Sequence, residues 1–158
     1  MRWASSALLV GVLAACGGGA AVTPSGARVI AHREVTSTQL SSHDGPAAVS
    51  VGLSDAARAA IVARVPTAVA TPDRVFVAAF QGGQRTGGYT IRIDRIERDG
   101  ERLLVHATFG EPPPGAIVTQ VLTSPVHVVS VARVDVVGVR IAVLLDASGT
   151  ERARASVS

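Results

Sequence analysis

Side chains that could carry chemistry are few and scattered in this 158-residue chain. No G-x-S-x-G sequence is present to form a nucleophile elbow. Asp94 and Glu97 are three apart on a predicted strand, so we expect them to point to opposite faces and not to act as a pair. We expect a histidine on a strand, such as His127, to be packed or hydrogen-bonded rather than a ligand. The residues therefore predict no enzyme, no metal site and no cofactor. No HExxH spacing links the histidines, which are His32, His43, His106 and His127.

The single cysteine, Cys16, cannot form a disulfide within the chain or a cysteine-based metal site. It follows a positive start, Met1-Arg2, and an apolar run from Ala4 to Ala15. Twelve residues of helix would span about 18 Å, which is less than the roughly 30 Å hydrocarbon core of a bilayer. The run is therefore typical of an export signal rather than of a membrane span.

The sequence Leu13-Ala14-Ala15-Cys16 resembles the lipobox of bacterial lipoproteins. The resemblance implies that residues 1–15 are a removable signal peptide and that Cys16 carries a diacylglycerol, with palmitate-type chains that hold it to a membrane. It places the protein in the cell envelope. Residue 17 is Gly and not the Asp of an inner-membrane retention signal, which favours the outer membrane where the organism has one. The alternative is a secreted protein cut near Ala14-Ala15 that keeps a free thiol.

The composition favours a β-rich fold without a nucleic-acid partner. Aromatic residues make up 3% of the chain, so the core must come from Val, Ile, Leu and Ala, and β-branched residues pack well on sheets. The net charge is +3, but the basic residues are all Arg and alternate with acids, as in the segment from Arg92 to Arg98. No Arg cluster is interleaved with stacking aromatics, so we expect no nucleic acid.

The hydrophobic pattern predicts a mainly β (α+β) domain over residues 27–148, a small antiparallel β-sandwich or partly open barrel with one short helix. Ser54 is a suitable N-cap for that helix, over residues 53–64, and Asp99-Gly100 predicts a hairpin turn. Residues 16–26 are predicted to be a lipidated cysteine and flexible tether, 37–46 a soft turn-rich stretch, and 149–158 a frayed polar tail. Strands are predicted over residues 27–35, 47–52, 75–80, 89–96, 103–108, 126–131 and 134–145, the last broken at Gly138.

Two loops are candidate binding elements. The stretch from Gly82 to Tyr89 lacks the Gly-Lys-Ser/Thr of a phosphate loop and leads into a strand. It is either a glycine-rich hairpin or a recognition loop with Tyr89 as an anchor. The second loop begins at Glu111-Pro-Pro-Pro-Gly115 and contains Thr119-Gln120 and Ser124-Pro125, whose polar groups either satisfy the loop backbone or contact a partner.

The span from Val75 to Arg133 resembles the C-terminal domain of the PrcB family, which is named for a component of a protease complex. Arg85 stands where the family often has proline, and Ser124 and Val126 replace usual aromatic residues. The matching pieces are Phe80-x-Gly82, Thr86-Gly87-Gly88-Tyr89, Ile91, Ile93, Pro114-Gly115, Val118-Thr119-Gln120, Leu122-Thr123, Pro125 and His127-Val128-Val129.

The resemblance implies a non-catalytic protein-binding domain on a lipoprotein, as an accessory subunit of a surface or secreted protease. The partners would be the membrane, through the lipid on Cys16, and a protein, which by resemblance alone would be a protease. One alternative is a protease inhibitor that presents the Gly82–Tyr89 loop, since Thr86-Gly87-Gly88-Tyr89 is similar to a loop of chagasin-like inhibitors. Another is a small-ligand binder or a structural envelope lipoprotein. The predicted contact residues are Arg85, Thr86, Gly87, Gly88, Tyr89, Thr119, Gln120 and Pro125.

Overall fold

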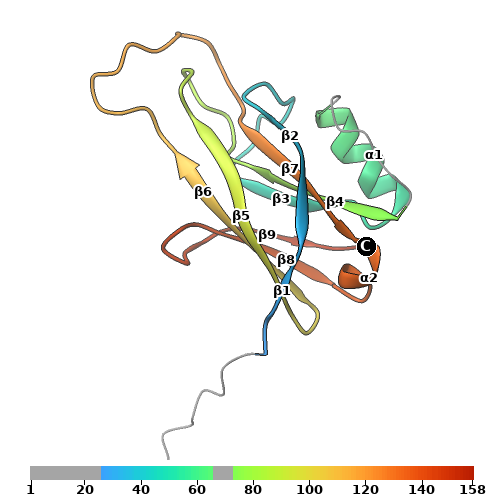
Figure 1. The fold of residues 1–158 in the computed structure, drawn as a ribbon. Helices are drawn as coiled ribbons and strands as arrows, with labels where there is room; N and C mark the ends of the chain where they lie inside the picture. Colours follow the sequence, from blue (N-terminus) through green and yellow to red (C-terminus); the bar gives the residue numbers. More distant parts are fainter. Residues whose placement is uncertain (1–25, 66–72) are drawn as a thin grey trace, which may run out of the picture.

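The computed structural model describes residues 26–65 and 73–158, which form two β-sheets packed face to face (Figure 1). The fold is mainly β and corresponds to a small β-sandwich, as predicted, and neither sheet closes into a barrel. All neighbouring strands are antiparallel except β6 and β8, which are parallel. The five-stranded sheet has the order β1 (Arg28–Ile30), β5 (Thr90–Asp99), β6 (Arg102–Gly110), β8 (Ile141–Leu145) and β9 (Glu151–Ser156). The four-stranded sheet has the order β2 (His32–Thr38), β7 (Val126–Ala132), β4 (Arg74–Phe80) and β3 (Ala48–Val51).

The neighbouring strands β4 and β7 are buried on both faces. On β4, alternate residues from Val75 to Ala79 pack against the five-stranded sheet. The intervening residues, from Phe76 to Phe80, pack against helix α1 (Asp55–Arg64). A strand that is covered on both faces needs apolar residues at successive positions. This explains why both strands are nearly continuous apolar runs in the sequence.

Helix α1 covers the outer face of the four-stranded sheet and confirms the predicted helix. The Ser54 side chain caps it by accepting the N–H of Ala57 at 3.2 Å, and Asp55 lies in the first turn, where the helix dipole favours negative charge. Ile61 and Val65 carry the contact with the sheet and are each 1% exposed. Within residues 26–65 and 73–158, no helix combines the length and apolar character needed to cross a bilayer.

The β5–β6 hairpin turns at Asp99-Gly100 as predicted, with Gly100 at a φ of 57°. A bulge between Ile93 and Arg95 adds a residue to β5, so that Ile96 returns to the core face. Because of this bulge, Asp94 and Glu97 share the outer face and bond to Thr108 and His106, two residues apart on β6. The prediction that the two carboxylates face opposite ways was therefore wrong.

The segment predicted as one first strand forms two. β1 pairs with β5 in the five-stranded sheet, and β2 pairs with β7 in the other sheet, so the chain crosses between sheets at Ala31. β2 continues to Thr38, further than the predicted strand end at Val35. A single apolar–polar pattern does not reveal at which residue a strand changes sheets.

The run predicted as one strand over residues 134–145 is also divided. Residues Arg133–Val136 form the short helix α2, and only Ile141–Leu145 form a strand, β8. β7 belongs to one sheet and β8 to the other, so the chain must turn between them. Gly138 serves this turn with a φ of 83°. The local preference of valine for strands is overridden here by the connection that the sandwich requires.

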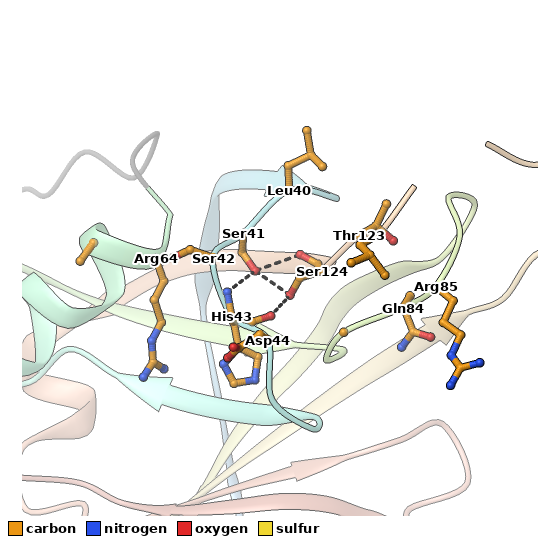
Figure 2. Close-up of a pocket in the computed structure, with 13 residues that line it drawn as sticks. Leu40, Ser41, Ser42, His43, Asp44, Arg64, Gln84, Arg85, Thr123 and Ser124 are labelled. Carbon is orange, nitrogen blue, oxygen red and sulfur yellow. Dashed lines mark hydrogen bonds between the residues drawn. The ribbon is translucent and has the colours of Figure 1, made fainter. Parts of the chain in front are cut away.

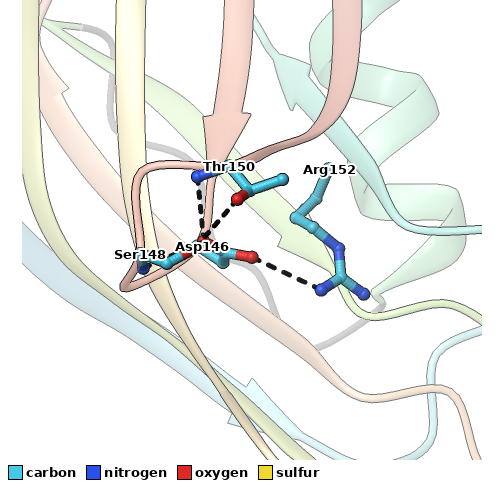
Figure 3. A network of polar contacts seen from close by, with 4 residues as sticks. All are labelled: Asp146, Ser148, Thr150 and Arg152. Atoms are coloured by element: carbon cyan, nitrogen blue, oxygen red, sulfur yellow. Dashed lines mark hydrogen bonds and ion pairs between the residues drawn. The ribbon is translucent and has the colours of Figure 1, made fainter.

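Residues 149–158, predicted as a frayed polar tail outside the domain, contain the edge strand β9, which pairs with β8. Ala153 and Ala155 pack on the core while Arg152 and Arg154 face outward, which suits an edge strand. The turn into β9 is built on Asp146, whose carboxylate accepts the N–H groups of Ser148 at 2.9 Å and Thr150 at 3.0 Å (Figure 3). The Ser148 hydroxyl, followed by the two N–H groups and Arg152, holds the pKa of Asp146 below its usual value. A carboxylate that accepts three bonds in one turn explains why so polar a segment is ordered.

His127 joins the two sheets through a hydrogen bond. Its side chain lies on the core face of β7, and its Nδ1 accepts the backbone N–H of Ile93 from β5 at 2.9 Å. An imidazole nitrogen that accepts this bond carries no proton, so the ring is neutral with the proton on Nε2. Burial lowers the pKa of His127 below 6.5 and outweighs the opposing effect of Glu34, whose carboxylate lies 3.8 Å from Nε2. His32 and Arg92 lower this pKa further.

The lowered pKa of His127 predicts that the stability of the fold depends on pH. Below about pH 6.5 the unfolded chain binds a proton on His127 that the folded chain resists, so the free energy of unfolding should fall as the pH is lowered. His127→Gln keeps an acceptor for the Ile93 N–H but does not titrate, and should flatten this dependence. His127→Leu leaves that N–H unpaired and should cost about 1–3 kcal/mol at neutral pH. Urea unfolding across the pH range measures both effects, and an unchanged pH dependence in His127→Gln would show that another group titrates.

Candidate partner-binding loops

The two predicted loops meet at one end of the sandwich. Residues 81–89 connect β4 to β5, residues 111–125 connect β6 to β7, and both cross from one sheet to the other (Figure 1). The N–H of Gln84 donates to the carbonyl of Thr123 at 2.7 Å, and the N–H of Thr123 donates back to Gln84 at 2.9 Å. The Thr123 hydroxyl donates to the carbonyl of Thr86 at 2.8 Å. The glycine-rich stretch is therefore a crossover bonded to the second loop and not a hairpin turn.

Glycine allows the close contact between these loops. The N–H of Gly87 donates to the carbonyl of Thr119 at 2.9 Å, and a Cβ at position 87 would collide with Thr119 Oγ1. Gly88 has a φ of 91°, and a Cβ there would lie 3.1 Å from the Pro112 side chain. The glycines thus serve the packing of one loop on the other.

A third segment, residues 39–47, completes this end of the molecule, and we call residues 39–47, 81–89 and 111–125 together the loop end. The N–H of Ser124 donates to the carbonyl of Gln39 at 2.8 Å, and the N–H of Ser41 donates to Ser124 at 3.1 Å. On its other side, the N–H of Gly83 donates to the carbonyl of Gly45 at 3.1 Å. Residues 37–46 were predicted only to be soft in the sense of flexible and turn-rich. The sequence did not reveal these bonds, because no local pattern signals contacts with residues so distant in the chain.

Serine and histidine side chains gather here, but their bonds are structural. The Ser41 hydroxyl donates to the carbonyl of Ser124 at 2.9 Å, and the Ser124 hydroxyl donates to the carbonyl of His43 (Figure 2). The His43 ring turns away from both hydroxyls: its Nε2 donates to the carbonyl of Pro46 at 2.7 Å, and the ring packs against Phe80 at a centroid distance of 4.8 Å. The hydroxyls and the imidazole are thus used to hold segment 39–47 on the sandwich.

A groove of about 620 Å³ opens at the loop end. Segment 40–44, the C-terminal end of α1, segment 83–85 and segment 122–124 form its walls (Figure 2). Charged side chains from three of these walls line it, namely Arg64, Arg85 and Asp44. Neither His106 nor His127 contributes to its lining. Its volume falls in the range of binding pockets, and its position coincides with the loops that the sequence singled out.

Large apolar side chains are exposed around this groove. Leu40 and Leu122, which line it, are 72% and 81% exposed, and Ile117 and Val121 in the second loop are exposed as well. Single exposed apolar residues are ordinary, but several on one end of a domain are typical of an interaction surface. Sequence reasoning missed these four residues, because exposure depends on which loop positions the fold turns outward.

The predicted contact residues divide into exposed and buried ones. Arg85 lines the groove, and Gly88, Thr119 and Gln120 are also exposed, whereas Thr86 and Tyr89 are half-buried. Gly87 and Pro125 are buried, and the carbonyl of Pro125 accepts the N–H of Gln81 at 2.9 Å. Both were predicted to contact a partner, but in the structure they are covered by contacts between the loops. Cys16 lies outside the described residues.

Two other histidines, His106 and His127, form hydrogen bonds within the sandwich. His106 bonds to Glu97 at 3.0 Å on the outer face of the five-stranded sheet, and His127 joins the sheets. Over the part of the chain that the structure describes, no group of three potential metal ligands converges.

The geometry describes a β-sandwich with an exposed loop surface, which is the form of a small recognition domain. Residues 75–132 match the family model described as PrcB C-terminal, as the sequence resemblance predicted. The matched segment runs from β4 to β7 and includes both interacting loops. No curated protein and no solved structure matches the chain.

The contact between Gly87 and Thr119 can be tested by a pair of substitutions. Gly87 does not have a positive φ, so Gly87→Ala acts mainly through the collision with Thr119 Oγ1 and should cost about 1 kcal/mol or more. Adding Thr119→Ala removes the colliding atom and should restore most of the loss, as a double-mutant cycle by chemical unfolding would measure. Gly83→Ala is the matched control, because its Cβ would meet only Asp44 O at an ordinary 3.4 Å. Equal tolerance of alanine at positions 83 and 87 would contradict the close packing of the loops.

Proposed function

We propose that this chain is a lipid-anchored, non-catalytic protein of the cell envelope whose loop end binds a protein partner, as an accessory subunit of a surface or secreted protease. The main support for the proposal is one observation: the two loops of the PrcB-like segment bond to each other and form one surface with exposed apolar residues. The family match supports a protease as the kind of partner.

The described domain begins at β1, and we call this point the chain entry. Its position favours a partner on the side away from the membrane. Arg28 begins β1 and pairs with Arg98, close to the β5–β6 turn. β5 runs from Thr90 beside the loops to Asp99 at that turn, and its 10 residues span about 33 Å. The described chain thus enters opposite the loop end (Figure 1). An anchor at Cys16 would leave the loop end facing outward.

The alternatives receive less support from the geometry. An inhibitor needs a reactive loop that projects into a cleft, whereas the main chain of residues 84–87 is bonded to the second loop. A small-ligand binder would use the groove, but the groove is rimmed by leucines that are mostly exposed, which suits a protein surface better.

The membrane anchor predicts a specific covalent change. In a bacterium that expresses the full chain, intact mass of the detergent-extracted protein should correspond to residues 16–158 with lipid on Cys16. Cys16→Ala should lose the lipid and keep residues 1–15. An unmodified thiol on the native protein, or uncleaved residues 1–15 in it, would remove the basis for the envelope assignment.

If the loop end binds the partner, a substitution there should reduce binding of the protease more than a similar substitution elsewhere. Leu122→Ser should reduce the amount of protease that co-purifies with the anchored protein by about tenfold or more, since it removes an exposed apolar side chain that lines the groove. The matched control is Val134→Ser, which changes a valine that is 78% exposed on α2, near the chain entry. Equal losses in both variants, or none in Leu122→Ser, would refute the loop end as the contact surface.

A further inference from the structure

The groove at the loop end has two arginines on its rim that no carboxylate neutralises within the described residues. Seven other described arginines form ion pairs with acids, as Arg92 does with Asp94 at 2.8 Å and Arg154 with Glu151 at 2.7 Å. Arg64 instead lies over the Phe80 ring at 5.9 Å, and Arg85 projects from the loop. Since neither is in an ion pair with a described carboxylate, these two are available to a ligand.

The two arginines come from different walls of the groove. Arg64 ends helix α1, whereas Arg85 belongs to the crossover between β4 and β5, and the groove separates them (Figure 2). The acidic group of the groove, Asp44, lies on the segment between them and leaves an excess of positive charge. A ligand that satisfies both guanidinium groups must therefore extend across the groove and carry more than one negative group.

Apolar side chains line the same groove. Leu40 and Leu122 line the groove while remaining mostly exposed, so a ligand seated there would cover them. Apolar contacts flanked by cationic groups are complementary to a chain that alternates apolar and acidic side chains. An extended peptide provides this alternation, because its successive side chains point in opposite directions.

We propose that the groove binds an extended acidic and apolar peptide segment of the partner protein, with carboxylates at Arg64 and Arg85 and apolar side chains over Leu40 and Leu122. This inference rests on the proposed function and names the part of the partner that the loop end recognises. It also assigns Arg85 a direct contact, whereas Ser41 and Ser124 act by holding the groove walls together.

The test uses the full chain in detergent and short fluorescein-labelled peptides of one length. One peptide contains leucines and glutamates, a second has lysines in place of the glutamates, and a third has serines in place of the leucines. Fluorescence anisotropy should show binding of the leucine–glutamate peptide only, weakening as salt is added. Arg64→Glu with Arg85→Glu should weaken this binding by about tenfold or more. Arg64→Gln with Arg85→Gln should weaken peptide binding less. This milder variant keeps the test valid if the charge-reversed protein fails to fold.

The matched control is Arg33→Glu with Arg102→Glu, which changes the net charge equally at two exposed arginines outside the groove. It should leave peptide binding nearly unchanged. Binding of the lysine peptide as tightly as the glutamate peptide, or full binding by the Arg64/Arg85 variants, would overturn the proposal. A dimer of this chain that Leu122→Ser dissociates, without peptide binding, would also overturn it by assigning the groove to a second copy.

The peptide-binding test and the protease co-purification test can fail independently of each other. If no peptide binds but Leu122→Ser still removes the co-purifying protease, the peptide proposal fails and the partner surface stands. If the peptide binds as expected but no protease is recovered, recognition of an acidic segment stands and the protease assignment fails.

Discussion

The whole structure depends on the pairing of β4 with β7, two strands that are buried on both faces. One face must be covered by a second sheet and the other by helix α1, because neither apolar face can be left in water. The chain leaves this pair at Phe80 to reach the second sheet through residues 81–89, and it returns through residues 111–125 to enter β7 at Val126. Since Phe80 and Val126 are paired partners, the two crossovers must lie side by side at the same end of the sandwich.

The loop end is thus a consequence of the core. Hydrogen bonds between Gln84 and Thr123 fix one loop on the other, and Ser124 adds segment 39–47 through its main chain and its hydroxyl. Polar groups that are used in this way are not available to a partner, and the groups that remain exposed are arginines, leucines and the tip of the second loop. The PrcB-like match ends at Ala132, and β8 and β9, which lie beyond it, extend the sheet that contains β5 and β6.

Much of the fold could be predicted from local patterns. The cap at Ser54, the turn at Asp99-Gly100 and the apolar runs of β4 and β7 are local signals, and the structure confirms all three. The errors arose where tertiary structure overrides local pattern. The valine-rich segment after β7 must turn from one sheet to the other and forms α2. The bulge in β5 places Glu97 on the same face as Asp94. The candidate loops were recognised from their glycines and prolines, but their burial was not, since Gly87 and Pro125 are covered by contacts from distant residues. Leu40, Arg64 and Leu122 join one groove only in three dimensions.

The most direct test of the loop end as a partner surface is site-specific photo-crosslinking in cells that produce the full chain. A benzophenone amino acid would replace Leu122 in one strain and Val134, an equally exposed residue near the chain entry, in another. The account predicts one discrete adduct with a protease from position 122 and none from position 134. Adducts of similar yield from both positions, or an adduct from position 134 alone, would contradict it.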